Sequence, residues 1–258
     1  MTTALAPPPR VSPLTADLDF AGRRVLVTGA ANGFGAAIAD LFAAHGATLV
    51  LADQEADAVT AKAAAIGPRA TAIVYDQADV ASVERLAAAA GDVDVLVNNA
   101  GRLLTKPLLE TSAAEIRGLI DVDLVGVMVL TPLLARGMVA RGRGVVVNIG
   151  SQTAFCGGEG RGIYAAAKAA IAQYTRAAAV EWGPHGVRAV CVAPGRSITR
   201  MTRHVVAGPS GDRGLDRVPL GRWGSAEEVA KLVVFLASDA ASYVTGETVI
   251  ADGGYVIG

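Results

Sequence analysis

The sequence predicts an α/β domain built on a parallel β-sheet, and three observations lead to this fold class. Short apolar runs of strand length alternate with longer helix-compatible stretches from residue 23 to the end of the chain. The runs are apolar on both faces, as strands covered by helices on both sides are. The chain has 258 residues, of which 52% are hydrophobic, so a single large domain can bury a sizeable core.

The order of these segments specifies the architecture. The expected strands are the runs 24–28, 48–52, 72–75, 93–97, 145–149 and 187–192. The expected helices are 35–45, 82–90, 112–138, 164–182 and 225–237. Gly46 and Gly91 can end helices in the left-handed conformation, and Ser225 with Glu228 has the pattern of a capping box. Repeated β-α units predict helices on both faces of the sheet and a ligand site at the carboxyl ends of the strands.

The amino-terminal residues 1–19 are predicted to form a flexible arm, followed by one domain over 20–258. The arm contains the proline run 7–9 and no apolar stretch long enough for a signal peptide. No apolar stretch elsewhere is long and uninterrupted enough to predict a membrane span, although mean hydropathy is +0.41. We therefore expect no membrane association and a cytoplasmic location.

Charge and cysteine content exclude several classes of function. The net charge is −1 and no basic stripe is present, so nucleic acid is not an expected partner. Cys156 and Cys191 lack metal-site spacing, and the histidines are scattered at positions 45, 185 and 204. We expect a reduced protein without a disulfide framework and without a metal.

A glycine-rich turn follows the first predicted strand. Gly29, Gly33 and Gly35 have the spacing Gly-x-x-x-Gly-x-Gly. Glycines there let backbone N–H groups approach a pyrophosphate at the start of the next helix. A plain tight turn is the alternative, but the position between strand and helix favours a dinucleotide site.

Asp53 ends the second predicted strand. A carboxylate at this point can accept both hydroxyls of an adenosine ribose and repel a 2′-phosphate, which predicts NAD rather than NADP. The alternative is a cap for the following helix. No basic residue is adjacent in sequence to attract a phosphate.

Three polar residues in the middle of the chain suggest acid–base chemistry. Tyr164 and Lys168 lie one turn apart on one helix face, and Ser151 follows a predicted strand. An ammonium near a phenol favours the phenolate form, which can act as a general base, while a serine hydroxyl can orient a substrate oxygen. As an isolated pattern, Tyr-x-x-x-Lys also occurs by chance on solvated helices.

Together these motifs resemble the single-domain branch of the short-chain dehydrogenase/reductase family, over essentially everything after Asp19. The resemblance rests on the turn 28–35, the Asn-Asn-Ala-Gly motif at 98–101, Ser151 with the motif at 164–168, and Pro-Gly at 194–195. The ending Asp-Gly-Gly at 252–254 is also similar. The resemblance implies a Rossmann-type, doubly wound, seven-stranded parallel sheet in a single domain.

The resemblance also implies residue roles. Tyr164 would donate and accept the proton, Lys168 would lower the pKa of the phenol and bind the nicotinamide ribose, and Ser151 would position the substrate oxygen. The residues expected around the rest of the cofactor are Gly29, Asn32, Gly33, Phe34, Gly35, Asp53, Asp76, Gln77, Asn98, Ala100, Gly101, Pro194, Gly195, Ser197 and Thr199.

One catalytic position departs from the family pattern. Asp123 stands where the family has an asparagine. Its backbone carbonyl could still hold a water that relays protons to Lys168, but the carboxylate lacks the amide donor and adds a negative charge. A shifted pH optimum is the expected consequence.

The stretch 196–224 corresponds to the substrate lid and is unusually basic. Its basic residues are Arg196, Arg200, Arg203, His204, Arg213, Arg217 and Arg222. They could hold an anionic substrate, or they could be solvated and paired with Asp212, Asp216, Glu227 and Glu228. Further candidate pocket residues are Arg102, Gln152, Thr153, Phe155, Cys156 and Arg161. Cys156 is expected to pack rather than react.

The resulting hypothesis is an NAD-dependent dehydrogenase/reductase that interconverts a secondary alcohol and a ketone on a small polyol, sugar or hydroxy acid. The alternative is a catalytically idle NAD-binding relative that acts as a redox-responsive interaction protein. An epimerase of the longer branch would need an additional domain. The alanine-lined helix 165–179 can approach a second copy closely, which predicts a homotetramer.

Overall fold

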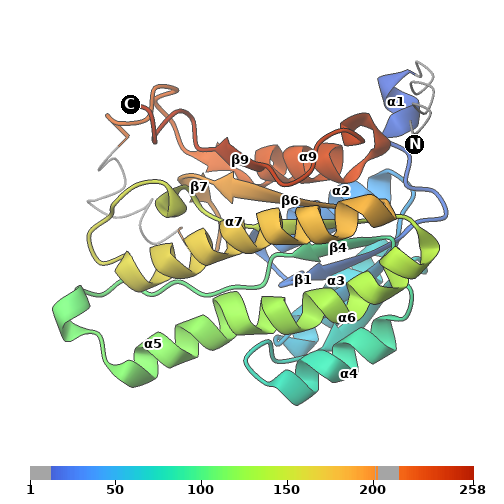
Figure 1. Cartoon of the computed structure of the whole chain (residues 1–258), viewed down its shortest axis with the longest axis horizontal. Coiled ribbons are helices and arrows are strands. Elements are labelled where there is room, and N and C mark those ends of the chain that lie inside the picture. Colours follow the sequence, from blue (N-terminus) through green and yellow to red (C-terminus); the bar gives the residue numbers. More distant parts are fainter. Residues whose placement is uncertain (1–12, 201, 203–214) are drawn as a thin grey trace, which may run out of the picture.

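A seven-stranded parallel sheet forms the centre of the molecule (Figure 1). The computed structural model describes residues 13–200, 202 and 215–258. The strand order is β3-β2-β1-β4-β5-β6-β9, and the predicted α/β class with seven strands is confirmed. The strands are β1 (Arg24–Thr28), β2 (Thr48–Asp53), β3 (Ala70–Val74), β4 (Val95–Asn98), β5 (Gly144–Ile149), β6 (Val187–Pro194) and β9 (Thr248–Ala251).

Helices cover both faces of this sheet. One face carries α2 (Gly33–Ala44), α3 (Ala56–Ile66) and α9 (Ala226–Ala237). The other face carries α4 (Val80–Ala90), α6 (Gly126–Arg141) and α7 (Gly162–Trp182), which lie in the foreground of Figure 1. Short 3₁₀ turns lie at η1 (Leu108–Glu110), η3 (Gln152–Ala154), η4 (Gly183–His185) and η5 (Asp239–Ala241).

Alternation along the strands divides the core into two layers. Val25 and Val27 of β1 pack with α2, α3 and α9, whereas Leu26 between them packs with α4, α6 and α7. Both faces are buried because each layer is closed by helices, which explains the apolar strand runs. The expectation of burial on both faces is wrong for β3, because it is the edge strand and Val74 is 55% exposed.

The predicted helices are all present with shifted ends, and α3 was missed. The stretch 112–138 is one continuous helical segment composed of α5 (Ala113–Ile120), a π-helical turn η2 (Asp121–Val125) and α6. The predicted capping box at Ser225 and Glu228 is confirmed, and Ser112 with Glu115 forms another. Within the predicted arm, the described residues include the short helix α1 (Leu14–Asp17).

The segment Ala113–Arg141 is long and apolar enough to cross a membrane by length and composition alone. Its apolar side chains Leu130, Leu134 and Met138 are buried against the sheet. The hydropathy of this segment is therefore accounted for by its place in the protein core.

Candidate active site

The site lies where β1 and β4 are neighbours, at the carboxyl edge of the sheet. From β1 the chain proceeds to β2 on one side, while β4 leads to β5 on the other. The loops after these two strands therefore diverge and leave room for a ligand between them. The glycine turn follows β1 and the Asn-Asn-Ala-Gly motif follows β4.

The glycine turn is shaped by two close approaches and one open position. A Cβ on Gly29 would lie 2.8 Å from the Ala100 Cα, and one on Gly35 would lie 2.1 Å from the Gly29 carbonyl oxygen. Gly33 has φ +58°, and a Cβ added to it would lie 3.6 Å from the Thr199 Cβ, an ordinary contact distance. Asn32 precedes α2 without capping it through its side chain. The first-turn N–H groups thus have no side-chain cap, which fits a pyrophosphate at this helix start.

We predict that Gly35→Ala lowers the free energy of unfolding by about 1–3 kcal/mol and weakens dinucleotide binding, because the added methyl meets a backbone carbonyl. Gly183→Ala is the matched control, since nothing lies within 4 Å of its added Cβ and its backbone is helical. Urea denaturation and NADH fluorescence titration measure both effects. Equal stability of the two variants would contradict the prediction.

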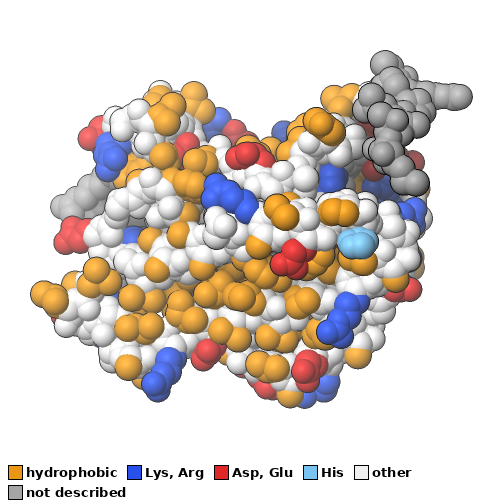
Figure 2. All heavy atoms as spheres, viewed as in Figure 1, with side chains coloured by type: hydrophobic (Ala, Val, Ile, Leu, Met, Phe, Trp, Pro, Cys, Tyr) orange, Lys and Arg blue, Asp and Glu red, His pale blue; other side chains and the backbone are white. Residues whose placement is uncertain are grey.

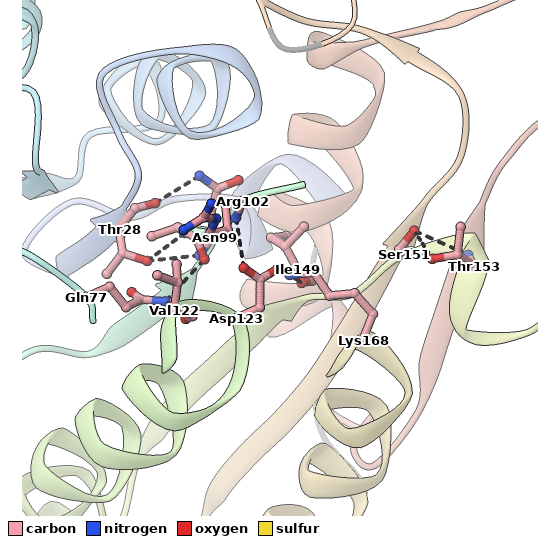
Figure 3. A network of polar contacts seen from close by, with 11 residues as sticks. Thr28, Gln77, Asn99, Arg102, Val122, Asp123, Ile149, Ser151, Thr153 and Lys168 are labelled. Carbon is pink, nitrogen blue, oxygen red and sulfur yellow. Dashed lines mark hydrogen bonds and ion pairs between the residues drawn. The ribbon is translucent and has the colours of Figure 1, made fainter. Parts of the chain in front are cut away.

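A hydrogen-bond network joins the two loops (Figure 3). The Thr28 Oγ1 accepts the backbone N–H groups of Asn99 and Ala100, each at 3.0 Å. The Asn99 amide donates to the carbonyls of Thr28 at 2.9 Å and Gly29 at 3.1 Å. Sequence analysis missed Thr28 and Asn99, although both are polar residues at the ends of apolar strands.

Asn98, expected beside the adenosine ribose, directs its side chain into the core. Its amide donates to Thr131 Oγ1 at 2.9 Å and to Asn148 Oδ1 at 2.8 Å. The Asn148 amide in turn donates to Thr175 Oγ1 at 2.9 Å. This buried network connects β4, β5, α6 and α7 behind the site, so the Asn98 side chain positions the strands rather than facing the cleft.

Asp53 at the end of β2 and Asp76 after the neighbouring strand β3 were both predicted to lie near the adenosine part of the cofactor. The Asp53 carboxylate accepts the N–H groups of Ala31 at 3.0 Å and Glu55 at 3.1 Å. Glu55, not Asp53, is the N-cap residue of α3. The Asp76 carboxylate accepts the Ala78 N–H at 2.9 Å. Asp53 therefore lies against the glycine turn, as a cofactor residue would.

The structure corrects one expectation about this region. No basic residue is adjacent to Asp53 in sequence, but the Arg200 guanidinium is ion-paired with Glu55, with one contact at 3.0 Å. The negative charges of Glu55 and, more weakly, Asp53 raise the pKa of Arg200. A cation therefore does lie near Asp53, delivered by a segment remote in sequence.

Gln77 is buried behind the cleft rather than open to it. Its amide donates to the carbonyls of Ala100 at 3.2 Å and Val122 at 2.7 Å. Its backbone approaches Gly126, where an added Cβ would lie 2.3 Å from the Gln77 carbonyl oxygen. Gln77 thus links the π-helical turn η2 to the loop after β4 through these two hydrogen bonds.

The π-helical turn η2 places Asp123 next to Lys168. The Asp123 side chain is 0% exposed and that of Lys168 is 6% exposed, with Oδ2 and Nζ 3.2 Å apart. Asp123 Oδ1 accepts the Arg102 N–H at 2.8 Å, and Lys168 donates to the Ile149 carbonyl at 3.2 Å. Burial acts to lower the pKa of Lys168, but Asp123 and Tyr164 outweigh it and the pKa is raised. Lys168 is therefore held as an ammonium.

Tyr164 and Ser151 complete the predicted trio. Lys168 Nζ lies 5.6 Å from the centre of the Tyr164 ring, which is half-buried near the start of α7. Ser151 is 7% exposed, and its Oγ accepts the Thr153 N–H at 3.2 Å and the Thr153 hydroxyl at 2.9 Å. Both Ser151 acceptor positions are used, so its own hydrogen is left to donate.

The segment that follows the Pro-Gly turn at the end of β6 approaches the glycine turn through Thr199, which an added Cβ on Gly33 would meet at 3.6 Å. A Cβ on Gly195 would lie 2.4 Å from the Asp252 Cα, so the chain ending packs directly on the Pro-Gly turn. The Ser197 hydroxyl donates to the Gly195 carbonyl at 3.3 Å, and the Thr199 hydroxyl lies 3.2 Å from that of Thr202. The short strands β7 (Ser197–Ile198) and β8 (Gly224–Ser225) pair at the two ends of the predicted lid.

Other predicted residues fall in different places. Phe34 packs partly into the core, and the Arg102 side chain is exposed, with Nη1 3.6 Å from an added Cβ on Gly118, away from the trio. Cys156 contacts the Gln152 carbonyl at 3.5 Å, as a packing residue would. Arg203, His204 and Arg213 lie outside the described residues. Within the described residues, no group of three metal-ligating side chains occurs.

Residues 29–256 match the family model described as enoyl-(acyl carrier protein) reductase. With this match, the fold and the arrangement of Ser151, Tyr164 and Lys168, the chain belongs to the short-chain dehydrogenase/reductase family. It is an oxidoreductase acting on CH–OH groups, and members of this family bind a nicotinamide cofactor.

Two curated relatives and one solved structure are similar over nearly the whole chain. Galactitol 2-dehydrogenase (L-tagatose-forming) of Cereibacter sphaeroides is 40% identical, over 92% of this chain and 96% of its own. Cis-4-hydroxycyclohexanecarboxylate dehydrogenase of Sinomonas cyclohexanicum is 42% identical, over 92% and 97%. A structure described as an NAD(P)-dependent gluconate 5-dehydrogenase from Beutenbergia cavernae, with NADP at low occupancy, is 38% identical with TM-score 0.90, over 94% and 100%.

Proposed function

We propose that this protein is an NAD(H)-dependent dehydrogenase/reductase that interconverts a secondary alcohol and a ketone on a small polyol, sugar or hydroxy acid. The observation that carries the proposal is Lys168, whose Nζ lies 5.6 Å from the centre of the Tyr164 ring and beside Gly101, in the loop that contacts the glycine turn at Gly29. The names of the relatives support the substrate class, since they include a neutral polyol and a hydroxy acid.

The proposed chemistry divides among these three residues. Bound nicotinamide supplies or accepts the hydride. In oxidation the Tyr164 phenolate takes the proton of the substrate alcohol and becomes the hydroxyl, and in reduction this hydroxyl gives the proton back to the substrate oxygen. Ser151 donates its remaining hydrogen to the substrate oxygen and stabilises the charge that develops there.

Lys168 supports proton transfer by Tyr164. Its ammonium lies 5.6 Å from the centre of the Tyr164 ring, donates to the Ile149 carbonyl at 3.2 Å and is ion-paired with Asp123 at 3.2 Å. A further N–H donor is available for a ribose hydroxyl or a relay water. Asp123 offsets part of the lysine charge, so we propose that oxidation by this protein has a more alkaline pH optimum than it would with asparagine at position 123.

The test is nicotinamide absorbance at 340 nm with NAD and NADP against neutral polyols, aldonic acids and hydroxy acids across pH. Turnover with NAD on one of these classes is expected. If NADH binds but no compound is turned over, the catalytically idle alternative takes the place of this proposal.

The cofactor preference is tested at the adenosine side. We predict that Asp53→Asn raises the NADP-to-NAD ratio of kcat/KM by about 10–100-fold, because the variant no longer repels a 2′-phosphate. Arg200 then contributes attraction, so Asp53→Asn combined with Arg200→Gln should show a smaller rise. Asp57→Asn, an exposed change on α3, is the control. An unchanged ratio in Asp53→Asn would remove the basis for preferring NAD.

We also propose a homotetramer. Figure 2 shows a broad hydrophobic area over the helices in the foreground, where α6 and α7 lie. Met128 on α6 is 44% exposed and Val180 on α7 is 77% exposed. Such exposed apolar surface favours a subunit interface. Light scattering should report four subunits, and Val180→Glu should lower the mass; a monomer in the parent protein would contradict this.

A further inference from the structure

The described arginines of the region 196–224 and its surroundings differ in their partners. Arg217 packs 4.6 Å from the centre of the Tyr255 ring and donates to the Tyr255 hydroxyl at 3.2 Å. An outer group is paired with carboxylates at the surface. Arg200 contacts Glu55 and Arg222 contacts Glu228, each with one bond at 3.0 Å. Their side chains are 62% and 56% exposed. Arg200 and Arg222 are therefore solvated and paired with carboxylates, which was the alternative to substrate binding for this basic stretch.

Arg196 belongs to the inner group. Its guanidinium carbon lies 5.7 Å from the centre of the Trp223 ring and 5.4 Å from that of Tyr255. Its Nε is buried and has no hydrogen-bond partner among the described residues. The two aromatic rings therefore contact the guanidinium without accepting the hydrogen bond of its buried Nε–H.

Arg161 is the second inner cation. It is half-buried, directly precedes α7 and lies within one helical turn of Tyr164. In the described part of the chain no carboxylate pairs with it. Burial lowers the pKa of Arg161, Tyr164 acts in the opposite sense, and the nearby charge of Arg196 lowers it further. Arg161 thus carries its charge one helical turn before Tyr164, at the N-cap of the helix that begins with Gly162.

Gln152 ties this pair to the serine side of the site. It follows Ser151 directly and is 8% exposed, with its Oε1 buried and unpartnered. An added Cβ on Gly195 would lie 2.7 Å from this oxygen, so the segments carrying Ser151 and Arg196 are in contact. Arg196 therefore follows a turn that contacts the segment carrying Ser151, and Arg161 lies one helical turn before Tyr164.

Two partly desolvated cations without carboxylate partners are costly in a folded protein unless an anion compensates them. A guanidinium group binds a carboxylate through paired N–H donors. We propose that Arg161 and Arg196 form a carboxylate-binding subsite, so that the substrate is a hydroxy acid with its carboxylate on these arginines and its reacting hydroxyl at Tyr164. This inference rests on the proposed function.

The experiment compares substrates that differ only in the carboxylate. Gluconate is paired with sorbitol, and cis-4-hydroxycyclohexanecarboxylate with the corresponding hydroxymethyl alcohol. The acid-to-neutral ratio of kcat/KM should exceed unity in the parent protein. It should fall by about 10–100-fold in Arg161→Gln and in Arg196→Gln, as expected for loss of a charge-assisted hydrogen bond. Arg222→Gln, an outer arginine with a surface partner, is the matched control and should leave the ratio unchanged.

Preference of the parent protein for the neutral member of each pair would overturn the subsite, as would an unchanged ratio in both inner variants. Because Arg196 also packs on aromatic rings, Arg196→Lys is measured beside Arg196→Gln, since the lysine retains the positive charge. If Arg196→Gln fails to fold, Arg161→Gln alone decides.

Failure of the proposed function is recognised separately. If the parent protein turns over neither acids nor neutral alcohols, calorimetric titration of gluconate and cis-4-hydroxycyclohexanecarboxylate onto the protein with NADH decides the subsite. Binding that is lost in Arg161→Gln supports it. Absence of binding, or binding unaffected by Arg161→Gln and Arg196→Gln, overturns it.

Discussion

Tyr164→Phe is expected to reduce kcat for alcohol oxidation by about 100–10,000-fold, the range that a positioned general acid/base contributes. The substitution removes only the hydroxyl and keeps the ring, whose centre lies 5.6 Å from Lys168 Nζ. Folding and cofactor affinity should therefore change little. The loss should appear in kcat rather than in the dissociation constant for NADH.

The measurement is initial-rate kinetics with a substrate found active in the parent protein, together with NADH fluorescence titration. Tyr243→Phe is the control, because Tyr243 is fully exposed on the surface. Unchanged activity in Tyr164→Phe would exclude the proposed role of this tyrosine. It would also favour the alternative in which the protein binds a nicotinamide nucleotide without catalysis.

Asp123→Leu is expected to lower the free energy of unfolding by about 3–5 kcal/mol at neutral pH, since it leaves a buried ammonium without its counter-ion. Lys168 is 6% exposed and lies 3.2 Å from the Asp123 carboxylate. The same change leaves the Arg102 N–H without its acceptor at 2.8 Å. Asp123→Asn keeps one acceptor oxygen, which can serve either the Arg102 N–H or Lys168 but not both, so its loss should be smaller than that of Asp123→Leu.

The pH dependence of this loss follows from the direction of the Lys168 pKa shift. In the parent protein the charge of Asp123 helps raise this pKa against the effect of burial, so the ion pair stabilises the fold at neutral pH and is lost only as pH rises through the raised pKa. In Asp123→Leu burial dominates and lowers the pKa. The unfolded chain then binds more protons than the folded one, so the variant should regain stability as pH rises.

Urea denaturation between pH 7 and pH 10 measures these effects, and pH–rate profiles of Asp123→Asn complete the comparison. With Asp123 neutralised, the Lys168 charge beside Tyr164 is no longer offset, so the rise of the oxidation rate with pH should move to lower pH. A profile that does not move would show that the ion pair has no influence on proton transfer. Equal stability of Asp123→Leu and Asp123→Asn would show that the buried ammonium does not need its partner.

The fold was predictable because its signals are local. The alternation of Val25, Leu26 and Val27 between two helix-covered faces reads directly as a buried strand. The exception is β3, which is apolar in sequence yet lies at the sheet edge, because strand order depends on contacts between segments far apart in the chain. Similarly, α3 has only a weak amphipathic pattern and was missed.

The candidate site was predictable where several short motifs together carry the signal. The glycine turn, Ser151, and Tyr164 with Lys168 are each ambiguous alone, and their order along the chain together resembles the short-chain dehydrogenase/reductase family. The sequence by itself thus determined the family and the residues expected to carry out proton transfer.

Only the tertiary structure decided which charges meet. It buried the Asp123 carboxylate against Lys168, set Arg200 beside Glu55, and left Arg161 and Arg196 without carboxylate partners among the described residues. It also directed Asn98 into the core and brought Asn99 to the glycine turn. The physical reason is that periodicity and spacing report contacts within one helix or turn, whereas the energy of a charge depends on burial and on partners supplied by remote segments.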